Sequence, residues 1–173
     1  MATEVFFASE DLIVSRTNTR GIIQYANDAF LRISGFDVEE LLGRPHSIIR
    51  HPDMPRSVFQ ILWSTIQRGE EVFAFVKNQC KNGDYYWVLA YVTLDRDPQT
   101  GEISGYFSVR RVANRNAIAQ VEDLYHQLWK IESKHASKMK GIEASIAALQ
   151  QFLDERGLSY VQMVYALQQG KII

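Results

Sequence analysis

The chain has 173 residues, a hydrophobic share of 46% and a formal net charge of -1, which suits one compact domain with a modest appendage. The near-neutral balance argues against a nucleic-acid-binding surface, since such a surface needs clustered Lys and Arg. The single cysteine, Cys80, excludes an internal disulfide, and no run of about 18 uncharged apolar residues predicts a membrane span. We therefore expect a cytoplasmic protein without a membrane-spanning segment.

The first elements along the chain are predicted to be a β-hairpin and a short helix. Residues 11–17 and 22–25 are two short apolar runs, separated by a polar turn that contains Gly21. Asn27 is a good N-cap for a short helix that Gly35 ends.

Two more helices are predicted before the chain changes character. Asp37 and Glu40 have the spacing of a capping box at the start of a short helix. Asp53 can cap a longer helix, in which apolar residues recur at four-residue spacing until Gly69 ends it. Short helices in such quick succession are expected to form a wall over a sheet.

Three strands are predicted next, over residues 72–80, 85–94 and 103–111, with Asn82-Gly83 as the hairpin turn between the first two. Alternation places one set of side chains together on the expected pocket side: Val76, Asn78, Val88 and Arg110. The element order predicts an α+β unit with an antiparallel sheet and helices over one face.

Residues 114–173 are predicted to be helical and to form an extension beyond a first domain of residues 1–113. Gly141 is expected to break or bend this extension. Its apolar stripes need cover, either from the outer face of the sheet, where Trp87 and Tyr91 are expected, or from a second subunit. The stripes suit a homodimer and self-packing equally.

Seven stretches follow one another in a distinctive order: IVSRT (13–17), YANDAF (25–30), ISGF (33–36), GRPH (43–46), RHPDMP (50–55), KNGDYYWVLA (81–90) and GYFSVR (105–110). In this order the chain resembles the PAS family, and within it the PAS domains of aerotaxis receptors. The resemblance implies a PAS fold, in which a five-stranded antiparallel sheet and short helices cradle a ligand. In aerotaxis receptors that ligand is FAD, and the domain reports redox state or oxygen.

The chain departs from these receptors in two respects. They typically carry a Pro-Trp pair early in the strand after the long helix, where this chain has Glu71-Val72. They also continue into membrane and signalling regions. Output is therefore expected to pass through the C-terminal helices to a separate signalling protein, and the apolar stripes of those helices are the basis for expecting a homodimer.

The segment Arg50-His51-Pro52-Asp53 is the first candidate cofactor contact. Arg50 and His51 could hold the diphosphate or ribityl part of FAD near the amino end of the long helix. Alternatively, Asp53 only caps that helix and Arg50 pairs with it.

Asn78 is the second candidate contact, because an amide can donate to and accept from a pyrimidine-like ring edge. Its position resembles that of the flavin-contacting Asn of light-oxygen-voltage domains. Those domains carry a second Asn on the neighbouring strand, where this chain has Val88. Arg110 could favour the anionic reduced forms of a flavin. The alternatives are a backbone-bonded Asn78 and an exposed Arg110. The full candidate cofactor-binding set is Asn27, Arg50, His51, Asp53, Val76, Asn78, Val88 and Arg110.

The sequence also leaves two other functions open. His46 or His51 could ligate heme b, and a ligand-free PAS module for dimerisation or docking is a third reading. The sequence has too few ligands for a zinc site and no nucleophile elbow, P-loop or dinucleotide fingerprint, so no enzyme activity is expected. Cys80 lies too far from the expected position of a photoadduct cysteine. The leading prediction is an FAD-binding redox or oxygen sensor in aerotaxis or related signal transduction.

Overall fold

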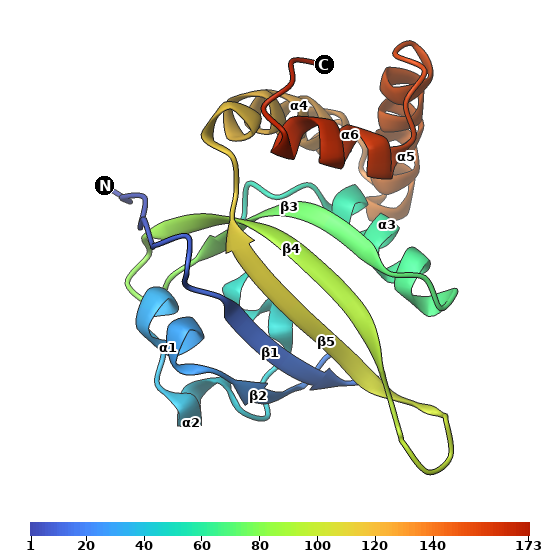
Figure 1. The fold of residues 1–173 in the computed structure, drawn as a ribbon. Coiled ribbons are helices and arrows are strands. Elements are labelled where there is room, and N and C mark those ends of the chain that lie inside the picture. Colours follow the sequence, from blue (N-terminus) through green and yellow to red (C-terminus); the bar gives the residue numbers. More distant parts are fainter.

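The computed structural model describes residues 1–173, and its centre is one antiparallel sheet with strand order β2-β1-β5-β4-β3. The strands are β1 (Ile13–Asn18), β2 (Ile23–Ala26), β3 (Val72–Gln79), β4 (Tyr85–Arg96) and β5 (Ile103–Val112). The helices are α1 (Asp28–Ser34), α2 (Val38–Leu41), the 3-10 helix η1 (His46–Ile49), α3 (Arg56–Gln67), α4 (Arg115–Ser133), α5 (Lys138–Asp154) and α6 (Tyr160–Gln168). The predicted α+β fold with a five-stranded antiparallel sheet is confirmed (Figure 1).

The first turns and caps form as their residues predict. The Asn27 side-chain oxygen accepts hydrogen bonds from the backbone N–H of Phe30 at 3.1 Å and of Val14 at 3.0 Å, so it caps α1 and ties it to β1. The capping box of Asp37 and Glu40 starts α2. Both caps satisfy backbone donors that a helix leaves unpaired at its start.

The prediction that Asp53 caps the longer helix is wrong. The N-cap of α3 is Pro55, which offers no side-chain acceptor. The buried carboxylate of Glu132, at the far end of α4, accepts instead from the backbone N–H of Arg56 at 3.0 Å and of Ser57 at 2.8 Å. A charged acceptor at a helix N-terminus is favourable, so the C-terminal extension completes a helix of the first domain.

The prediction that Gly141 breaks a helix is also wrong. The chain turns earlier, between Lys134 and Ser137, and Gly141 lies inside α5. A Cβ atom at Gly141 would lie 2.7 Å from the carbonyl oxygen of Glu132. Glycine is used here because it allows α5 to pack closely against the end of α4.

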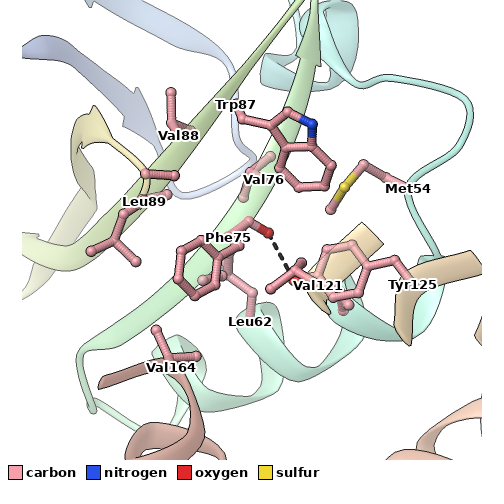
Figure 2. Packing of buried hydrophobic residues seen from close by; sticks show 14 of the residues in the cluster. Met54, Leu62, Phe75, Val76, Trp87, Val88, Leu89, Val121, Tyr125 and Val164 are labelled. Carbon is pink, nitrogen blue, oxygen red and sulfur yellow. Dashed lines mark hydrogen bonds between the residues drawn. The ribbon is translucent and has the colours of Figure 1, made fainter. Parts of the chain in front are cut away.

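The extension covers the outer face of its own sheet (Figures 1 and 2). Phe75, Trp87 and Leu89 are buried beneath Tyr125 of α4 and Val164 of α6, and the Tyr125 hydroxyl donates to the Phe75 carbonyl oxygen at 2.8 Å. Burial of each large apolar side chain contributes about 1.5–3 kcal/mol. Of the two predicted kinds of cover, the structure shows self-packing.

The two ends of the extension are also hydrogen-bonded to each other. The Gln168 side chain accepts from the backbone N–H of Asn114 at 3.0 Å, and the Asn114 amide donates back to the Gln168 carbonyl at 3.3 Å. The Gln120 amide donates to the carbonyl of Lys171 at 3.0 Å and accepts from the N–H of Ile173 at 3.0 Å. The beginning and the end of the three-helix segment are thus held together. No helix combines the length and apolar character needed to cross a bilayer.

Candidate cofactor site

The candidate site lies on the sheet face that is turned toward α1, η1 and α3. The strand register pairs Asn78 with Tyr86 and Val76 with Val88, and it places Arg110 of β5 opposite Ala90. Alternation along the strands brings all of these side chains to the same face. Val76, Val88 and Arg110 therefore share the face on which the sequence placed them.

A cleft of about 330 Å³ opens between this face and the short helices. The 3-10 helix and the loop after it form one wall through His46, Ile49 and Arg50. The aromatic rings of Phe59 and Trp63 on α3 form another. Asn78 lies in the lining beside them. The cleft has the mixed apolar and polar lining and the size of a small-molecule site.

Arg110 is a buried cation without a carboxylate partner. It is 2% exposed, donates to the Ser15 hydroxyl at 2.6 Å and lies 3.4 Å from the Nε2 atom of His46. Its guanidinium stacks 4.5 Å from the centre of the Phe30 ring. Burial lowers the pKa of Arg110 to about 10, so the cation persists at neutral pH and lacks a compensating negative charge.

His46 is neutral beside this cation. Although the residue as a whole is partly exposed, its imidazole is enclosed. Burial, followed by the charge of Arg110, lowers the pKa of His46 to about 3. The Nε2 atom lies 3.1 Å from the Ser15 hydroxyl. The imidazole therefore has a hydrogen-bonding role within the protein.

Polar atoms without partners gather on this face. Asn78 is 3% exposed and Tyr86 is fully buried, and burial raises the pKa of the Tyr86 hydroxyl, which stays protonated. The buried side-chain atoms that lack a hydrogen-bond partner are Thr17 Oγ1, Arg50 Nε, Asn78 Nδ2, Tyr86 OH and Arg110 Nε. Because an unpaired buried polar group costs about 1–3 kcal/mol, this set has the character of a ligand site.

Arg50 approaches the cleft from the loop after η1. Its backbone forms an isolated bridge with Asn78, and its guanidinium lies 3.7 Å from the centre of the Phe59 ring. Burial, and then the charge of Arg56, lowers the pKa of Arg50. The alternative in which Arg50 pairs with Asp53 is wrong, since no ion pair joins them. Arg50 is thus free to meet a ligand in the cleft.

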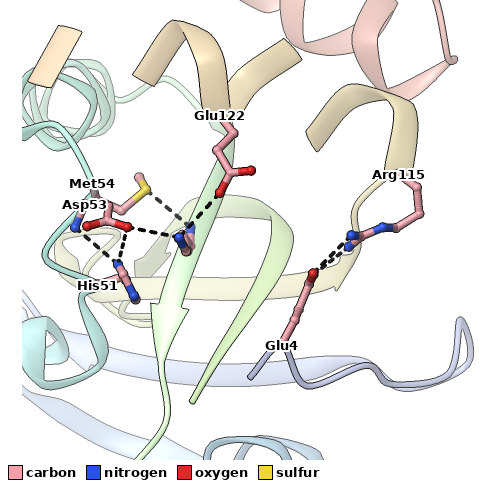
Figure 3. Close-up of polar contacts among 7 residues, drawn as sticks. Glu4, His51, Asp53, Met54, Arg115 and Glu122 are labelled. Atoms are coloured by element: carbon pink, nitrogen blue, oxygen red, sulfur yellow. Dashed lines mark hydrogen bonds and ion pairs between the residues drawn. The ribbon is translucent and has the colours of Figure 1, made fainter. Parts of the chain in front are cut away.

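His51 and Asp53 lie toward the opposite sheet face, where their partners are Tyr85 and Lys77, and Figure 3 shows the two side chains beside Met54. The His51 and Tyr85 rings pack edge to face with their centres 5.8 Å apart, and the His51 Nδ1 atom accepts from the backbone N–H of Asp53 at 3.2 Å. The Asp53 carboxylate lies 3.1 Å from the ammonium group of Lys77. Burial, and then the charge of Lys77, lowers the pKa of His51. The structure therefore does not bring these two residues to the site in which the sequence grouped them.

Asn27 and Cys80 also have roles outside the cleft. The Asn27 side-chain nitrogen donates to the Leu12 carbonyl oxygen at 2.8 Å, while the side-chain oxygen accepts the two bonds of the cap. The Cys80 thiol is buried against the carbonyl of Ile33, and burial raises its pKa to about 11. Sequence reasoning missed the walls formed by Phe59 and Trp63, although their four-residue spacing indicates one shared helix face.

Comparison with known proteins identifies the class. Residues 23–107 match the family model of the PAS fold, so the chain carries a PAS domain. Solved light-oxygen-voltage domains have the same fold: the dark structure of aureochrome1 matches with a TM-score of 0.53 and 24% identity over 71% of this chain and 86% of that one. A second, from a study of a flavin analogue, matches with a TM-score of 0.55 and 23% identity over 67% and 87%.

Among curated proteins, the chain is similar to the aerotaxis receptor of Escherichia coli (strain K12), with 44% identity over 122 residues. It is also similar to the nitrogen fixation regulatory protein of Klebsiella pneumoniae, with 31% identity over 98 residues. The matches cover 70% and 57% of this chain but 24% and 20% of those proteins. The particular resemblance to aerotaxis receptors that the sequence motifs indicate is thus confirmed for the PAS region.

Proposed function

We propose that the chain is a sensor that binds FAD non-covalently in the cleft and signals a change of redox state or oxygen through its C-terminal helices. The observation that carries the proposal is the group of unpaired polar atoms on the cleft side of the sheet. Most of them are N–H or O–H donors, whereas a flavin ring and its diphosphate are rich in acceptors. The 44% identity to an aerotaxis receptor supports the redox and oxygen assignment.

The residues on this face fit a flavin. Asn78 and Tyr86 can donate to a ring edge, and Phe59 and Trp63 can line a flat aromatic group. Arg110 would hold negative charge beside it, and Arg50 can reach the polar chain. FAD, when bound, would supply a reversible change of charge at its ring. The protein residues bind and orient the ring and exclude water from it.

Heme is a weaker candidate for the same site. Iron ligation requires a free imidazole nitrogen, but Nε2 of His46 faces the Ser15 hydroxyl at 3.1 Å and the Arg110 guanidinium at 3.4 Å. His51 lies on the other face of the sheet. The donor-rich lining therefore favours FAD over heme.

The output of this sensor is proposed to pass to a separate signalling protein, without enzyme activity in the chain itself. Trp129, Val161 and Tyr165 are large apolar side chains of the extension that remain exposed, so a homodimer through these helices stays a prediction. A cytoplasmic location also stays a prediction, based on the unpaired Cys80 thiol.

The test is the absorbance spectrum of the purified full chain, followed by titration of the colourless fraction with FAD, FMN and hemin. We expect a flavin spectrum and tighter binding of FAD than of FMN. Asn78→Ala should weaken FAD binding about tenfold, as expected for the loss of a buried hydrogen bond, or shift the midpoint potential. Asn116→Ala, on the exposed side of α4, is the matched control. A Soret band, or no saturable binding of either flavin, would refute the proposal.

A further inference from the structure

A second hollow lies on the opposite side of β3 from the cofactor cleft, between α4 and the loop that carries Asp53 and Met54. Its volume is about 390 Å³. Trp87, Tyr125 and Trp129 contribute aromatic rings to its lining. The self-packing of the extension leaves this space open, because α4 crosses the sheet with Tyr125 buried and Trp129 42% exposed.

The lining of this groove has an excess of negative charge. Asp53, Glu122 and Asp123 bring three carboxylates, whereas Lys77 is the only lysine or arginine, and His126 adds an imidazole. The Lys77 ammonium lies 3.1 Å from Asp53 and 3.4 Å from Glu122 (Figure 3). The Lys77 side chain is 9% exposed, while those of Asp53 and Glu122 are 67% and 55% exposed. The carboxylates therefore face solvent with their charge only partly balanced from below.

Trp129 and Met54 also line a smaller hollow of about 180 Å³, to which Arg56 and Glu132 contribute charged side chains. Trp129 is 42% exposed, and a half-exposed tryptophan is a side chain that commonly anchors a protein partner. The same ring lines the groove together with the exposed carboxylates of Glu122 and Asp123, which suits a cation, because the face of an aromatic ring attracts positive charge. The apolar and electrostatic features of the groove thus favour a ligand that combines a positive charge with an apolar group.

We propose that this groove docks a segment of a partner protein that presents an arginine or lysine side chain next to an apolar residue. The cationic head would lie among Glu122, Asp123 and the Trp129 ring, and the apolar neighbour would cover the exposed part of Trp129. The inference names the partner chemistry of the proposed sensor and rests on that function only for its biological role.

The position of the groove explains how a partner could respond to the cofactor. Lys77 and Asn78 are consecutive residues of β3 that point to opposite faces, Lys77 into the groove and Asn78 into the cleft. Likewise, Arg50 lines the cleft and Asp53, three residues later, lines the groove. These two segments would connect a change on the cofactor side with the groove.

The groove is tested by NMR on the ¹⁵N-labelled full chain, using the indole N–H signals of Trp87 and Trp129. The probes are N-acetyl-arginine amide and N-acetyl-lysine amide, with N-acetyl-norleucine amide as the uncharged comparison. We expect saturable shifts with the two cationic probes and at least fivefold weaker binding of the norleucine probe. Equal binding of all three probes, or no shift with the cationic ones, would overturn the proposal.

Charge-neutralised variants test the assignment of residues. Glu122→Gln combined with Asp123→Asn should raise the Kd of the arginine probe at least fivefold, because it removes two of the three carboxylates of the groove. Both side chains are exposed, and Asp53 remains as an ion-pair partner of Lys77. The matched control, Asp28→Asn combined with Glu39→Gln, changes two exposed acids on α1 and α2 and should leave the Kd unchanged. An equal effect of both pairs would mean nonspecific attraction and would sink the inference.

The titrations are repeated on flavin-free and flavin-loaded protein, which separates the two proposals. Arginine binding by a chain that never takes up flavin supports the groove and refutes the cofactor. Flavin uptake by a chain that does not bind the arginine probe supports the cofactor proposal and refutes the groove.

Discussion

The two faces of the central sheet are built from the same strands, but they differ in whether their buried polar atoms have hydrogen-bond or ion-pair partners. On the outer face, Phe75 and Trp87 are buried under the extension, the Tyr125 hydroxyl has a backbone acceptor, and Lys77 has two carboxylates. On the face toward the short helices, Arg110 lacks a carboxylate, and the unpaired polar atoms of Asn78 and Tyr86 lie on neighbouring strands.

This difference shows that the unpaired atoms are a property of one face and not of the packing in general. The buried polar groups of the outer face are paired within the chain, while the inner face leaves a set of buried donors without acceptors. Buried polar groups that the chain itself pairs serve stability, whereas a face with spare donors is prepared for a ligand. The following variants test each half of this contrast.

The outer face would be broken by Phe75→Ala. Phe75 is 1% exposed, and loss of a buried phenylalanine costs about 3–5 kcal/mol. Chemical denaturation should show this loss, while Phe6→Ala, at a side chain 70% exposed, should change the unfolding free energy by less than about 0.5 kcal/mol. A cost for Phe75→Ala below about 1 kcal/mol would mean that the extension does not cover the sheet in solution.

The inner face can be examined through pH. The pKa of His46 is about 3 in the folded chain, against an ordinary value of 6.5, so between these values the unfolded chain binds a proton that the folded chain does not. The unfolding free energy should therefore fall as the pH decreases from 6.5 toward 3, by about 1.4 kcal/mol per pH unit from this group, and His46 should not affect it above 6.5.

His46→Gln removes this contribution and should flatten the pH dependence of stability below pH 6.5. Urea unfolding between pH 4 and pH 7 measures the slope. His135→Gln, at an exposed position, is the control and should keep the slope of the parent chain. An unchanged slope in His46→Gln would contradict the enclosed, neutral imidazole.

Arg110→Met separates stability from ligand binding. Replacing an uncompensated buried cation with an apolar side chain should leave the unfolding free energy of the flavin-free protein unchanged or higher. FAD binding should weaken by about 1.5–3 kcal/mol, the contribution of a charged hydrogen bond, as measured by flavin titration. Equal losses of stability and of binding would assign Arg110 a structural role instead.

The joint between the two halves is tested by Glu132→Gln. The variant keeps the shape of the side chain but removes the charge at the start of α3, so it should destabilise the protein by about 1 kcal/mol. Thermal unfolding measures this effect, with the exposed Glu143→Gln as the neutral comparison. If Glu132→Gln and Glu143→Gln behave alike, the cap is unimportant.

Local signals in the sequence were sufficient for most of the fold. The Asn27 cap, the capping box at Asp37 and the Asn82-Gly83 hairpin are short-range features that depend on neighbouring residues. The alternation that placed Asn78 and Arg110 on one face is a property of strand geometry. These predictions needed no information about distant parts of the chain.

The remaining features depend on contacts across long sequence separations. Asp53 is in a good position to cap α3, but Lys77 attracts its carboxylate, and Glu132 provides the cap from 76 residues away. His51 follows Arg50 directly, yet the backbone turn sends the two side chains to opposite faces. Neither outcome can be derived from spacing, because both depend on which partner the tertiary fold brings near.

The clasp between Asn114 and Gln168, reinforced at Gln120, has a mechanical consequence. Because its two ends are hydrogen-bonded to each other, the three-helix segment is expected to move as one rigid unit and not as three independent helices. Spectroscopic labels at its two ends should keep a constant separation if the whole segment tilts on the sheet, whereas a label pair between the segment and the exposed Asp28 of α1 should register the tilt.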